Sequence, residues 1–344
     1  MRRTKIVCTL GPATKDDKIL RALIDNGMNV ARQNFSHGTH ESHKIDHDRV
    51  IRIAKEAGKP VATLLDTKGP EVRLRKFKGG AKPEILTGGT FILTTREEEG
   101  TIERASISYK GLPGDISAGT RILIDDGNVI LRCNEIKDNG DGTSDIVCSV
   151  LNGGVLSDNK GVNVPGVKLS MPYISEVDES DIRFAAQENF DFVAASFVTC
   201  ADDVLEVRRA MDALCVELAC DRITPEELQD LKKACDTFEA AVKTDDIKQI
   251  AQADVALHDI IVQATGNQRL IQLVNNLSEQ MYRYRFEYIK DFSQHERLVE
   301  EHKVIYESIV KKDKETASNM AKVHIDNQKK AIIRQIRLER EKNK

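Results

Sequence analysis

Residues 195–214 read ASFVTCADDVLEVRRAMDAL, and the character of the chain changes within this stretch. Before it, short apolar runs alternate with amphipathic helical patterns, and after it only helical patterns remain. The alternation over residues 5–67 follows the order β-α-β-α-β, which predicts parallel strands with helices packed outside them. We therefore expect an α/β fold followed by an all-α segment, with the seam inside residues 195–214.

The composition is typical of a globular protein, with 31% charged and 40% hydrophobic residues in a chain of 344. The net charge of -4 gives no general reason to expect binding to nucleic acid or to a membrane. No apolar run approaches the roughly 18 residues of a membrane span, and the amino terminus enters a strand pattern too quickly for a signal peptide. We expect a cytoplasmic protein whose seven scattered cysteines are reduced.

The α/β part has two blocks that are separated by an insertion. Residues 71–165 contain short alternating strands such as TFILTT and SDIVCSV, punctuated by GG, PGD and NGDG, which predicts a small antiparallel β domain. We therefore divide the chain into a partial barrel (1–70 and 166–203), the inserted β domain (71–165) and a helical domain (204–344). Strands are expected at 5–11, 28–36, 60–67 and 191–198, the first and last of them buried, and helices at 16–27, 41–58 and 175–190, the last capped by Ser175.

Polar side chains follow two of these strands, at the carboxyl ends where parallel sheets carry their chemistry. Several oxygen ligands beside Arg and Lys suit a hard cation next to a phosphate, although ordinary loop capping would also explain them. The residues are Arg32, Asn34, Ser36 and His37 after one strand and Asp66, Thr67 and Lys68 after the next.

The second half reads as an antiparallel bundle of helices with short polar connections. Thr224, Pro225 and Glu227 predict one capped helix start, and Ser293 with Glu296 predicts another. The basic end 329–344 is most simply the solvated face of a last helix, with a nucleic-acid-binding arm as the alternative. The expected helices are 201–222, 223–243, 245–264, 268–289, 295–312 and 313–336.

Four possible metal ligands are spaced along these helices. Asp254 and His258 are four residues apart and so share one helix face, while His302 and His324 fall in the middle of two later helices. A lone histidine in a helix is usually a hydrogen-bonded core residue, and a metal-free core remains the alternative. Three histidines and an Asp that converge in a bundle would suit a divalent transition metal with N and O ligands.

Five motifs in the first half resemble bacterial pyruvate kinase over residues 1 to about 208: VCTLGPAT, ARQNFSHG, LDTKGPEVR, NKGVNVPG and DFVAASFV. The resemblance implies a partial TIM-type barrel, a mobile β-barrel lid, and phosphoryl transfer from phosphoenolpyruvate to ADP in glycolysis. Gln33 stands where the family usually has an apolar residue. The implied contacts are Arg32 to the substrate phosphate, Asn34, Ser36, Asp66 and Thr67 to potassium, and Asn34, His37, Arg73 and Lys160 to ADP or ATP.

The family pattern stops after residue 198. Pyruvate kinases continue with a strand whose Lys stabilises the transferring phosphoryl group, then a Glu and a later Asp that bind magnesium, and nothing similar follows here. About four of the eight strands of a complete barrel are present, and the family's carboxy-terminal regulatory domain has no counterpart. Because phosphoryl transfer depends on positioning and charge neutralisation, we expect potassium ligands without magnesium ligands, and little kinase activity.

Segments of the second half resemble the ligand-sensing (FCD) domain of GntR-family regulators of the FadR subgroup, over about residues 204–335. They are RRAMDALCVELACDRITPEEL, DVALHDIIVQATGNQRL, HKVIYESIVKKD and HIDNQ. The resemblance implies that Asp254, His258, His302 and His324 bind zinc, nickel or manganese, which helps to hold a small carboxylate effector. His295 has no counterpart in the motif, and we expect it to be exposed. Since no winged helix-turn-helix precedes the sensor, DNA binding is not expected.

Together these features predict a chimera, in which a kinase fragment is joined to a complete effector domain through a helix shared by both. Three functions remain open: pyruvate kinase activity, a metal-dependent carboxylate-binding module without kinase activity, or a chain in which neither half works. A half barrel exposes two unpaired strand edges, so we expect residues 1–200 to aggregate, to open locally or to pair with another copy, and we expect a homo-oligomer.

Overall fold

The computed structural model describes residues 4–244 and 246–342, without the side chains of residues 278–285, 287 and 331–342. The chain forms two compact units, one made of residues 1–69 and 174–344 and the other of residues 70–173. The second unit contains the β insertion that the sequence predicts at 71–165. The half barrel and the helical segment share the first unit.

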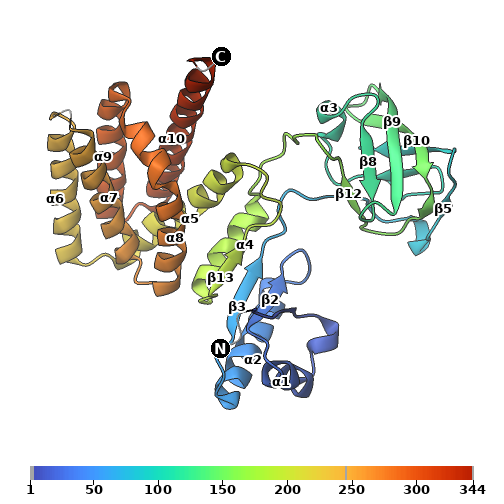
Figure 1. Cartoon of the computed structure of the whole chain (residues 1–344), viewed down its shortest axis with the longest axis horizontal. Helices are drawn as coiled ribbons and strands as arrows, with labels where there is room; N and C mark the ends of the chain where they lie inside the picture. The colour runs from blue at the N-terminus through green and yellow to red at the C-terminus, as the bar shows by residue number, and fades with distance from the viewer. Residues whose placement is uncertain (1–3, 245, 343–344) are drawn as a thin grey trace. The chain divides into compact units, whose positions relative to one another are not determined.

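The first unit begins with a four-stranded sheet in the order β1-β2-β3-β13, and all three neighbouring pairs are parallel (Figure 1). The predicted β-α-β-α-β alternation is therefore confirmed. The elements of this half barrel are β1 (Val7–Thr9), the 3-10 turn η1 (Pro12–Thr14), α1 (Asp17–Asp25), β2 (Val30–Asn34), α2 (His40–Ala57), β3 (Ala62–Asp66), α4 (Glu176–Gln187) and β13 (Phe192–Ala194).

Local sequence signals account for the ends of these helices. The side chain of Asp16 caps α1, and Thr39 caps α2 through the backbone N–H of Ser42. Helix α2 ends at Gly58, whose φ of 61° lies in the left-handed region that glycine adopts without strain. The predicted cap of α4 is confirmed, because the Ser175 hydroxyl accepts a hydrogen bond from the backbone N–H of Asp178.

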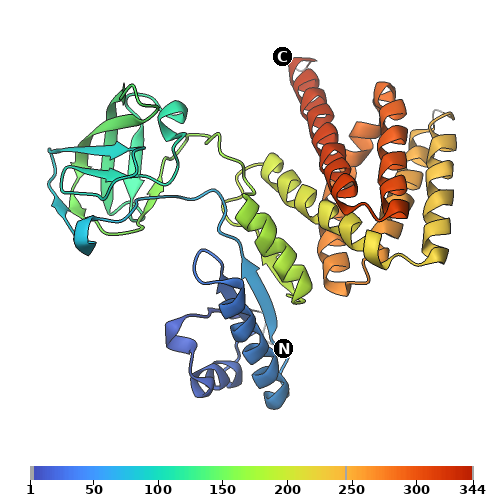
Figure 2. The ribbon, with the colours of Figure 1, turned by 180° about the vertical axis from the view of Figure 1, so that it is seen from behind.

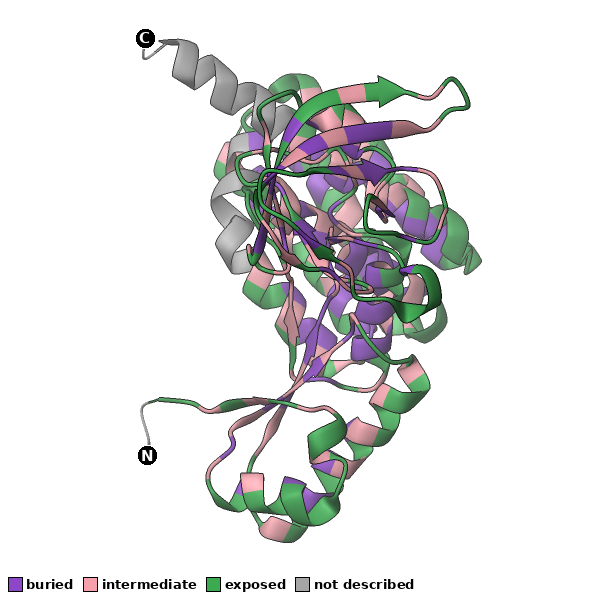
Figure 3. Ribbon diagram, turned by 90° about the vertical axis from the view of Figure 1, so that its right-hand side faces the viewer, coloured by how far each residue is buried: buried purple, intermediate pink, exposed green. Residues whose placement is uncertain are grey.

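The sheet buries less than the sequence predicts. The expected buried strand 191–198 is wrong in extent and in burial: it forms only Phe192–Ala194, Phe192 is 47% exposed and Phe197 is 51% exposed. Val7 in β1 is exposed as well. Among the described residues no strand pairs with the outer side of β1 or β13. These apolar side chains therefore lack the neighbours that would cover them in a closed barrel. Figure 3 colours each described residue along the ribbon by its burial.

The rest of the first unit is helical, as predicted, and no helix in the described ranges is long and apolar enough to cross a membrane. Figures 1 and 2 show these helices gathered side by side, with α5 against α7 and α10, and α6 against α7 and α9. The predicted capping box of Thr224 and Glu227 is confirmed. The helices are α5 (Ala201–Arg222), α6 (Pro225–Ala241), α7 (Ile247–Ala264), α8 (Gln268–Ile289), α9 (His295–Lys311) and α10 (Lys314–Lys342).

The start of α9 differs from the prediction. Ser293 does not cap it, because Asp291 accepts hydrogen bonds from the N–H and hydroxyl of Ser293 and starts a 3-10 turn (η3, Phe292–Gln294). Helix α9 then begins at His295 without a side-chain cap. The expectation that His295 is exposed is also wrong: it is buried, and its Nε2 lies 2.8 Å from the carbonyl oxygen of Ile289.

Helix α4 connects the half barrel to the helical segment through charged and polar contacts. The guanidinium of Arg183 bonds both carboxylate oxygens of Glu217 on α5. Lys322 on α10 donates to Glu179 on α4 at 2.8 Å. The amide of Asn267, the cap of α8, donates to the carbonyl of Ala186 at 2.6 Å. These contacts, made from three helices of the segment, explain why both parts belong to one compact unit.

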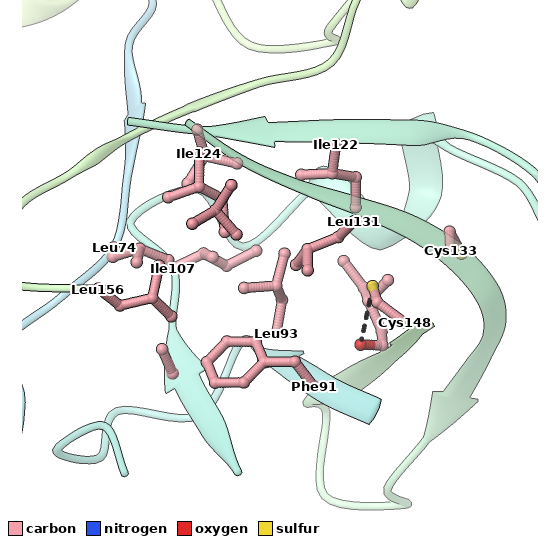
Figure 4. Packing of buried hydrophobic residues seen from close by; sticks show 14 of the residues in the cluster. Leu74, Phe91, Leu93, Ile107, Ile122, Ile124, Leu131, Cys133, Cys148 and Leu156 are labelled. Carbon is pink, nitrogen blue, oxygen red and sulfur yellow. Dashed lines mark hydrogen bonds between the residues drawn. The ribbon is translucent and has the colours of Figure 1, made fainter. Parts of the chain in front are cut away.

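The second unit is a seven-stranded sheet in the order β4-β12-β8-β9-β10-β6-β7, antiparallel except for the β6–β7 pair. Backbone hydrogen bonds join its two outer strands, since Arg75 donates to Ser106 and Ser108 donates to Arg73. Apolar side chains from the strands fill the interior (Figure 4). The strands are β4 (Val72–Arg73), β6 (Thr90–Thr94), β7 (Arg104–Ser106), β8 (Arg121–Ile124), β9 (Val129–Asp138), β10 (Ser144–Asn152) and β12 (Gly161–Asn163), with the pair β5 (Glu84–Ile85) and β11 (Gly154–Val155), the short helix α3 (Leu112–Asp115) and the 3-10 turn η2 (Lys78–Gly80) beside them.

Candidate functional site

The polar residues after β2 and β3 lie at one edge of the four-stranded sheet. The register pairs Asn34 with Asp66 and Asp66 with Ala194, so β2, β3 and β13 end next to one another. Chain segments that follow the carboxyl ends of parallel strands share that edge of the sheet. The structure therefore places five of the predicted residues in one region: Arg32, Asn34, Ser36, Asp66 and Thr67.

Arg32 and Asp66 form an ion pair at this edge. Two guanidinium nitrogens of Arg32 bond the same carboxylate oxygen, Nε at 3.0 Å, and its Nη1 donates to Thr9 Oγ1 at 2.7 Å. The other oxygen of Asp66 accepts from the Ser196 hydroxyl at 2.8 Å, while the Ser196 N–H donates to Thr67 Oγ1 at 3.1 Å. Ser196 was not singled out from the sequence, although it lies two residues after the end of β13, at the same edge.

The turn after β2 is organised by Asn34. Its side-chain oxygen accepts a hydrogen bond from the Ser36 N–H at 3.0 Å, and its carbonyl accepts one from the His37 N–H at 3.3 Å. The imidazole of His37 is exposed, while its carbonyl lies 2.7 Å from His43 Nε2. The side chain of buried Gln33 lies 3.0 Å from the other ring nitrogen of His43, which gives this amide a polar partner.

The remaining two residues expected to contact a nucleotide lie in the second unit. Arg73 in β4 donates to Glu71 at 2.6 Å and to the carbonyl of Asn159 at 2.6 Å. Lys160 precedes β12, the neighbour of β4, and donates to Asp125 at 2.7 Å. Arg73 and Lys160 are thus close in the sheet of that unit, and each is held by a carboxylate.

A second cluster lies inside the helical segment, where the structure brings together all four predicted metal ligands. One ligand nitrogen each of His258 (α7), His302 (α9) and His324 (α10) lies within 4.8 Å of those of the other two. The ring centroids are 5.3, 5.2 and 5.1 Å apart. One carboxylate oxygen of Asp254 lies 3.4 Å from His302 Nε2 and 3.7 Å from His258 Nε2.

The cluster is shielded from solvent by the packing of the helices. Asp254 is 1% exposed and His302 is 2% exposed, and the ring of Phe238 on α6 packs edge-on against His302 at 4.6 Å. A cavity of about 20 Å³ adjoins His258 and His324, with space on the order of one water molecule. A buried carboxylate among imidazoles is costly unless a cation or hydrogen bonds stabilise it, and such clusters are arrangements that proteins use to hold metal ions.

A larger cavity of about 300 Å³ lies between α6 and α9. His302 contributes to its wall, together with Cys235 from α6 and Tyr306 from α9. Burial raises the pKa of the Cys235 thiol to about 11, so this side chain is a neutral thiol near pH 7.

Three polar residues that the sequence reasoning missed surround His324. Its Nδ1 lies 2.7 Å from Glu301 Oε2, and its Nε2 lies 2.8 Å from the side-chain nitrogen of Gln328. The amide of Asn327 donates to the other oxygen of Glu301 at 2.7 Å. Two signals could have found them: Glu301 directly precedes His302, and Gln328 lies one helical turn after His324.

The carboxylate of Glu301 is kept ionised by its neighbours. Burial alone would raise the pKa of Glu301, but the hydrogen bonds from His324 and Asn327 and the charge of Arg297 outweigh it and hold this pKa below its ordinary value. Arg297 Nε lies 3.3 Å from Glu301 Oε1. A buried carboxylate with three such partners is a fixed acceptor beside the histidine cluster.

Parallel strands that alternate with helices, with polar side chains gathered at the strand ends, define the first part of the chain as a (β/α)-barrel-type protein. The family model for the pyruvate kinase barrel domain matches residues 1–277. The chain therefore belongs to the pyruvate kinase family.

Known proteins match the first part of the chain. Pyruvate kinases of Staphylococcus aureus strains USA300 and COL are each 48% identical to it over 212 residues, which is 62% of this chain and 36% of the relative. The crystal structure of Cryptosporidium parvum pyruvate kinase is similar with a TM-score of 0.56 and 40% identity, over 61% of this chain and 43% of that one. The chain spans about 36% of the length of the curated relatives it matches.

Proposed function

We propose that this pyruvate-kinase-family chain is a metal-dependent module that binds a small carboxylate, and that its working site lies in the helical segment. The observation that carries the proposal is the convergence of His258, His302 and His324 beside Asp254. These four side chains come from three helices, so a metal bound among them would also hold the helices together.

The donor set fits a divalent transition metal. Neutral imidazoles and a carboxylate are suitable ligands for zinc, nickel or manganese, and the same four residues are those that the resemblance to the FadR-type sensor domain implies. When bound, the metal would act as a Lewis acid that holds an anionic oxygen. Asp254 and the three histidines would hold the metal, and a small carboxylate would occupy a coordination position that they leave open.

We infer that the barrel part does not complete phosphoryl transfer from phosphoenolpyruvate to ADP. After β13 the described chain continues only as helices and turns, so no further strand there supplies the Lys and the acidic magnesium ligands on which the family depends. The residues present do not fit a magnesium site of that kind. The chemistry of the oxygens of Asn34, Ser36, Asp66 and Thr67 does fit potassium, as the resemblance implies.

Pyruvate kinase activity is the second candidate, and the strand-end cluster favours it. In this reading Arg32 would bind the substrate phosphate. It is paired with Asp66, so the phosphate would have to compete with this carboxylate. In this reading Asn34 and His37 would contact the nucleotide.

Two measurements on the purified chain separate the candidates. Metal analysis followed by calorimetric titration with zinc, nickel and manganese tests the first, and a lactate-dehydrogenase-coupled assay with phosphoenolpyruvate, ADP, potassium and magnesium tests the second. One equivalent of metal with no pyruvate formation supports the proposal. Protein that neither carries nor binds any of the three metals refutes it, and magnesium-dependent pyruvate formation establishes the kinase reading.

A further inference from the structure

The environment of His324 determines which of its nitrogens carries the proton. Glu301 Oε2 lies 2.7 Å from Nδ1, which is hydrogen-bond distance. Nδ1 is therefore placed to carry the proton and to donate it to this oxygen. In a neutral imidazole the other nitrogen, Nε2, then carries a lone pair.

The contact on the other side of the ring agrees with this assignment. The side-chain nitrogen of Gln328 lies 2.8 Å from Nε2, and an amide N–H is only a donor, so Nε2 accepts. The partners of His324 thus form one consistent chain, from the Gln328 amide through the imidazole to the Glu301 carboxylate. With Nδ1 occupied by Glu301, Nε2 is the nitrogen that a metal could use.

Glu301 is itself held in place by contacts independent of His324. It is 4% exposed, its Oε1 accepts from Asn327 at 2.7 Å, and Arg297 lies 3.3 Å from the same oxygen. Arg297 in turn donates to the hydroxyl of buried Tyr288 at 3.2 Å. Two donors therefore hold Oε1 of Glu301, which limits the freedom of this carboxylate to turn its other oxygen, Oε2, away from the imidazole.

We propose that Glu301 is a positioning residue, which fixes His324 as the Nδ1–H tautomer and leaves Nε2 as its metal-binding nitrogen, while the Gln328 amide occupies that nitrogen until a metal displaces it. This inference rests on the proposed function for the metal, but the tautomer is a property of the metal-free protein. Partners of this kind keep a ligand in its binding tautomer and increase its basicity, and their loss costs about 10–100-fold in metal affinity.

The tautomer is tested in the metal-free full chain by long-range ¹H–¹⁵N correlation spectra of protein labelled at histidine, with His324 assigned by its substitution. Wild-type protein should show the Nδ1–H form. Glu301→Gln keeps an acceptor oxygen and should preserve this form, whereas Glu301→Leu removes the acceptor and should change it. Gln328→Ala should leave it unchanged, because Glu301 still accepts the proton of Nδ1.

Zinc titration calorimetry then measures the consequence for metal binding. Glu301→Leu should bind zinc about 10–100-fold more weakly than wild type, and Glu301→Gln should restore part of this loss. Glu300→Gln changes an exposed carboxylate on the same helix and should have no effect. If Glu301→Leu does not fold, the role of Glu301 is still tested by the tautomer of His324 in the wild type and by the zinc affinities of Glu301→Gln and Glu300→Gln.

The positioning role and the metal site fail in different ways. An Nε2–H tautomer of His324 in the wild type, or an unchanged tautomer and zinc affinity in Glu301→Leu, overturns the role of Glu301. Wild-type protein that shows the Nδ1–H form but binds no zinc supports the positioning of His324 and overturns the proposed metal function.

Discussion

Replacement of His302 by Ala should abolish the stabilisation of the helical segment by metal. His302 is the buried centre of the cluster, 3.4 Å from Asp254 and next to both other imidazoles. Its removal takes away one of three nitrogen ligands and one of the three helices that the metal would connect. We therefore expect zinc to raise the melting temperature of the wild type and to leave that of the variant almost unchanged.

The size of the effect follows from mass action. At a free zinc concentration 100 times the Kd, binding adds about 2.7 kcal/mol to the free energy of unfolding. In a unit of this size, each kcal/mol added to the free energy of unfolding raises the melting temperature by about 2–4 °C. The melting temperature of the wild type should therefore rise by about 5–11 °C. Loss of a residue that holds a metal ligand in place weakens metal binding by up to about 100-fold, and loss of a direct ligand such as His302 should weaken it at least as much. At the same zinc concentration, zinc would then add at most about 0.4 kcal/mol to the free energy of unfolding of the variant.

Scanning calorimetry with zinc and with a chelator measures this difference within each variant. The loss of packing between His302 and Phe238 lowers the stability of both forms equally and so cancels. His295→Ala is the matched control, because His295 is a buried histidine on the same helix that bonds the carbonyl of Ile289 instead of a metal. It should lower the melting temperature but keep the full zinc-dependent rise.

Two results would refute this reasoning. One is a His302→Ala variant that retains the zinc-dependent rise of the wild type. The other is a wild type whose melting temperature is the same in zinc and in chelator, which would make the cluster a metal-free core of separately hydrogen-bonded histidines.

Three further outcomes are expected. Turnover of phosphoenolpyruvate and ADP should be undetectable in a lactate-dehydrogenase-coupled assay, and robust magnesium-dependent turnover by pure protein would contradict the inferred loss of the magnesium site. Because β1 (Val7–Thr9) and β13 (Phe192–Ala194) are edge strands, their amide hydrogens should exchange rapidly in a monomer. Light scattering should detect pairing with a second copy of the chain. Strong protection of these amides in a demonstrated monomer would contradict the expected exposure of the two edges. Burial lowers the pKa of His47 below 6.5, its ordinary value, so the His47 imidazole binds a proton more tightly in the unfolded chain than in the folded one. The free energy of unfolding should therefore fall as the pH drops below about 6.5. Urea unfolding across this range should show a shallower pH dependence for His47→Leu, and an equal slope would exclude His47 as a source of it.

Much of the fold was readable from local patterns. Alternating apolar and helical periodicities predicted the parallel strands, and Ser175 and Thr224 marked the starts of two helices because a hydroxyl at that position accepts a backbone N–H of the first turn. The same reasoning failed at Ser293, where Asp291 two residues earlier captures the hydroxyl and begins a different turn. Competition between nearby acceptors depends on backbone geometry, which a capping motif does not contain.

The candidate metal ligands were also visible in sequence, since Asp254 and His258 stand one helical turn apart and His302 and His324 lie on later helices. Sequence spacing alone could not predict that three helices would bring one nitrogen of each histidine within 4.8 Å of the others, with Asp254 beside them. Glu301 was missed for the same reason: its contact with His324 spans 23 residues and exists only because α9 packs against α10.

Local sequence patterns were sufficient to predict most strands and helices and the residue types available for chemistry, because helix caps and hydrophobic periodicity act over a few neighbouring residues. They did not predict the early end of β13 or the start of α9. The tertiary structure decided what each segment contacts. It left Phe192 and Phe197 exposed because no strand follows β13 in the described sheet, it buried His295 against a carbonyl, and it enclosed Glu301 beside the histidine cluster. Burial and side-chain partners are set by residues distant in the chain, and only the packing of complete elements brings these together.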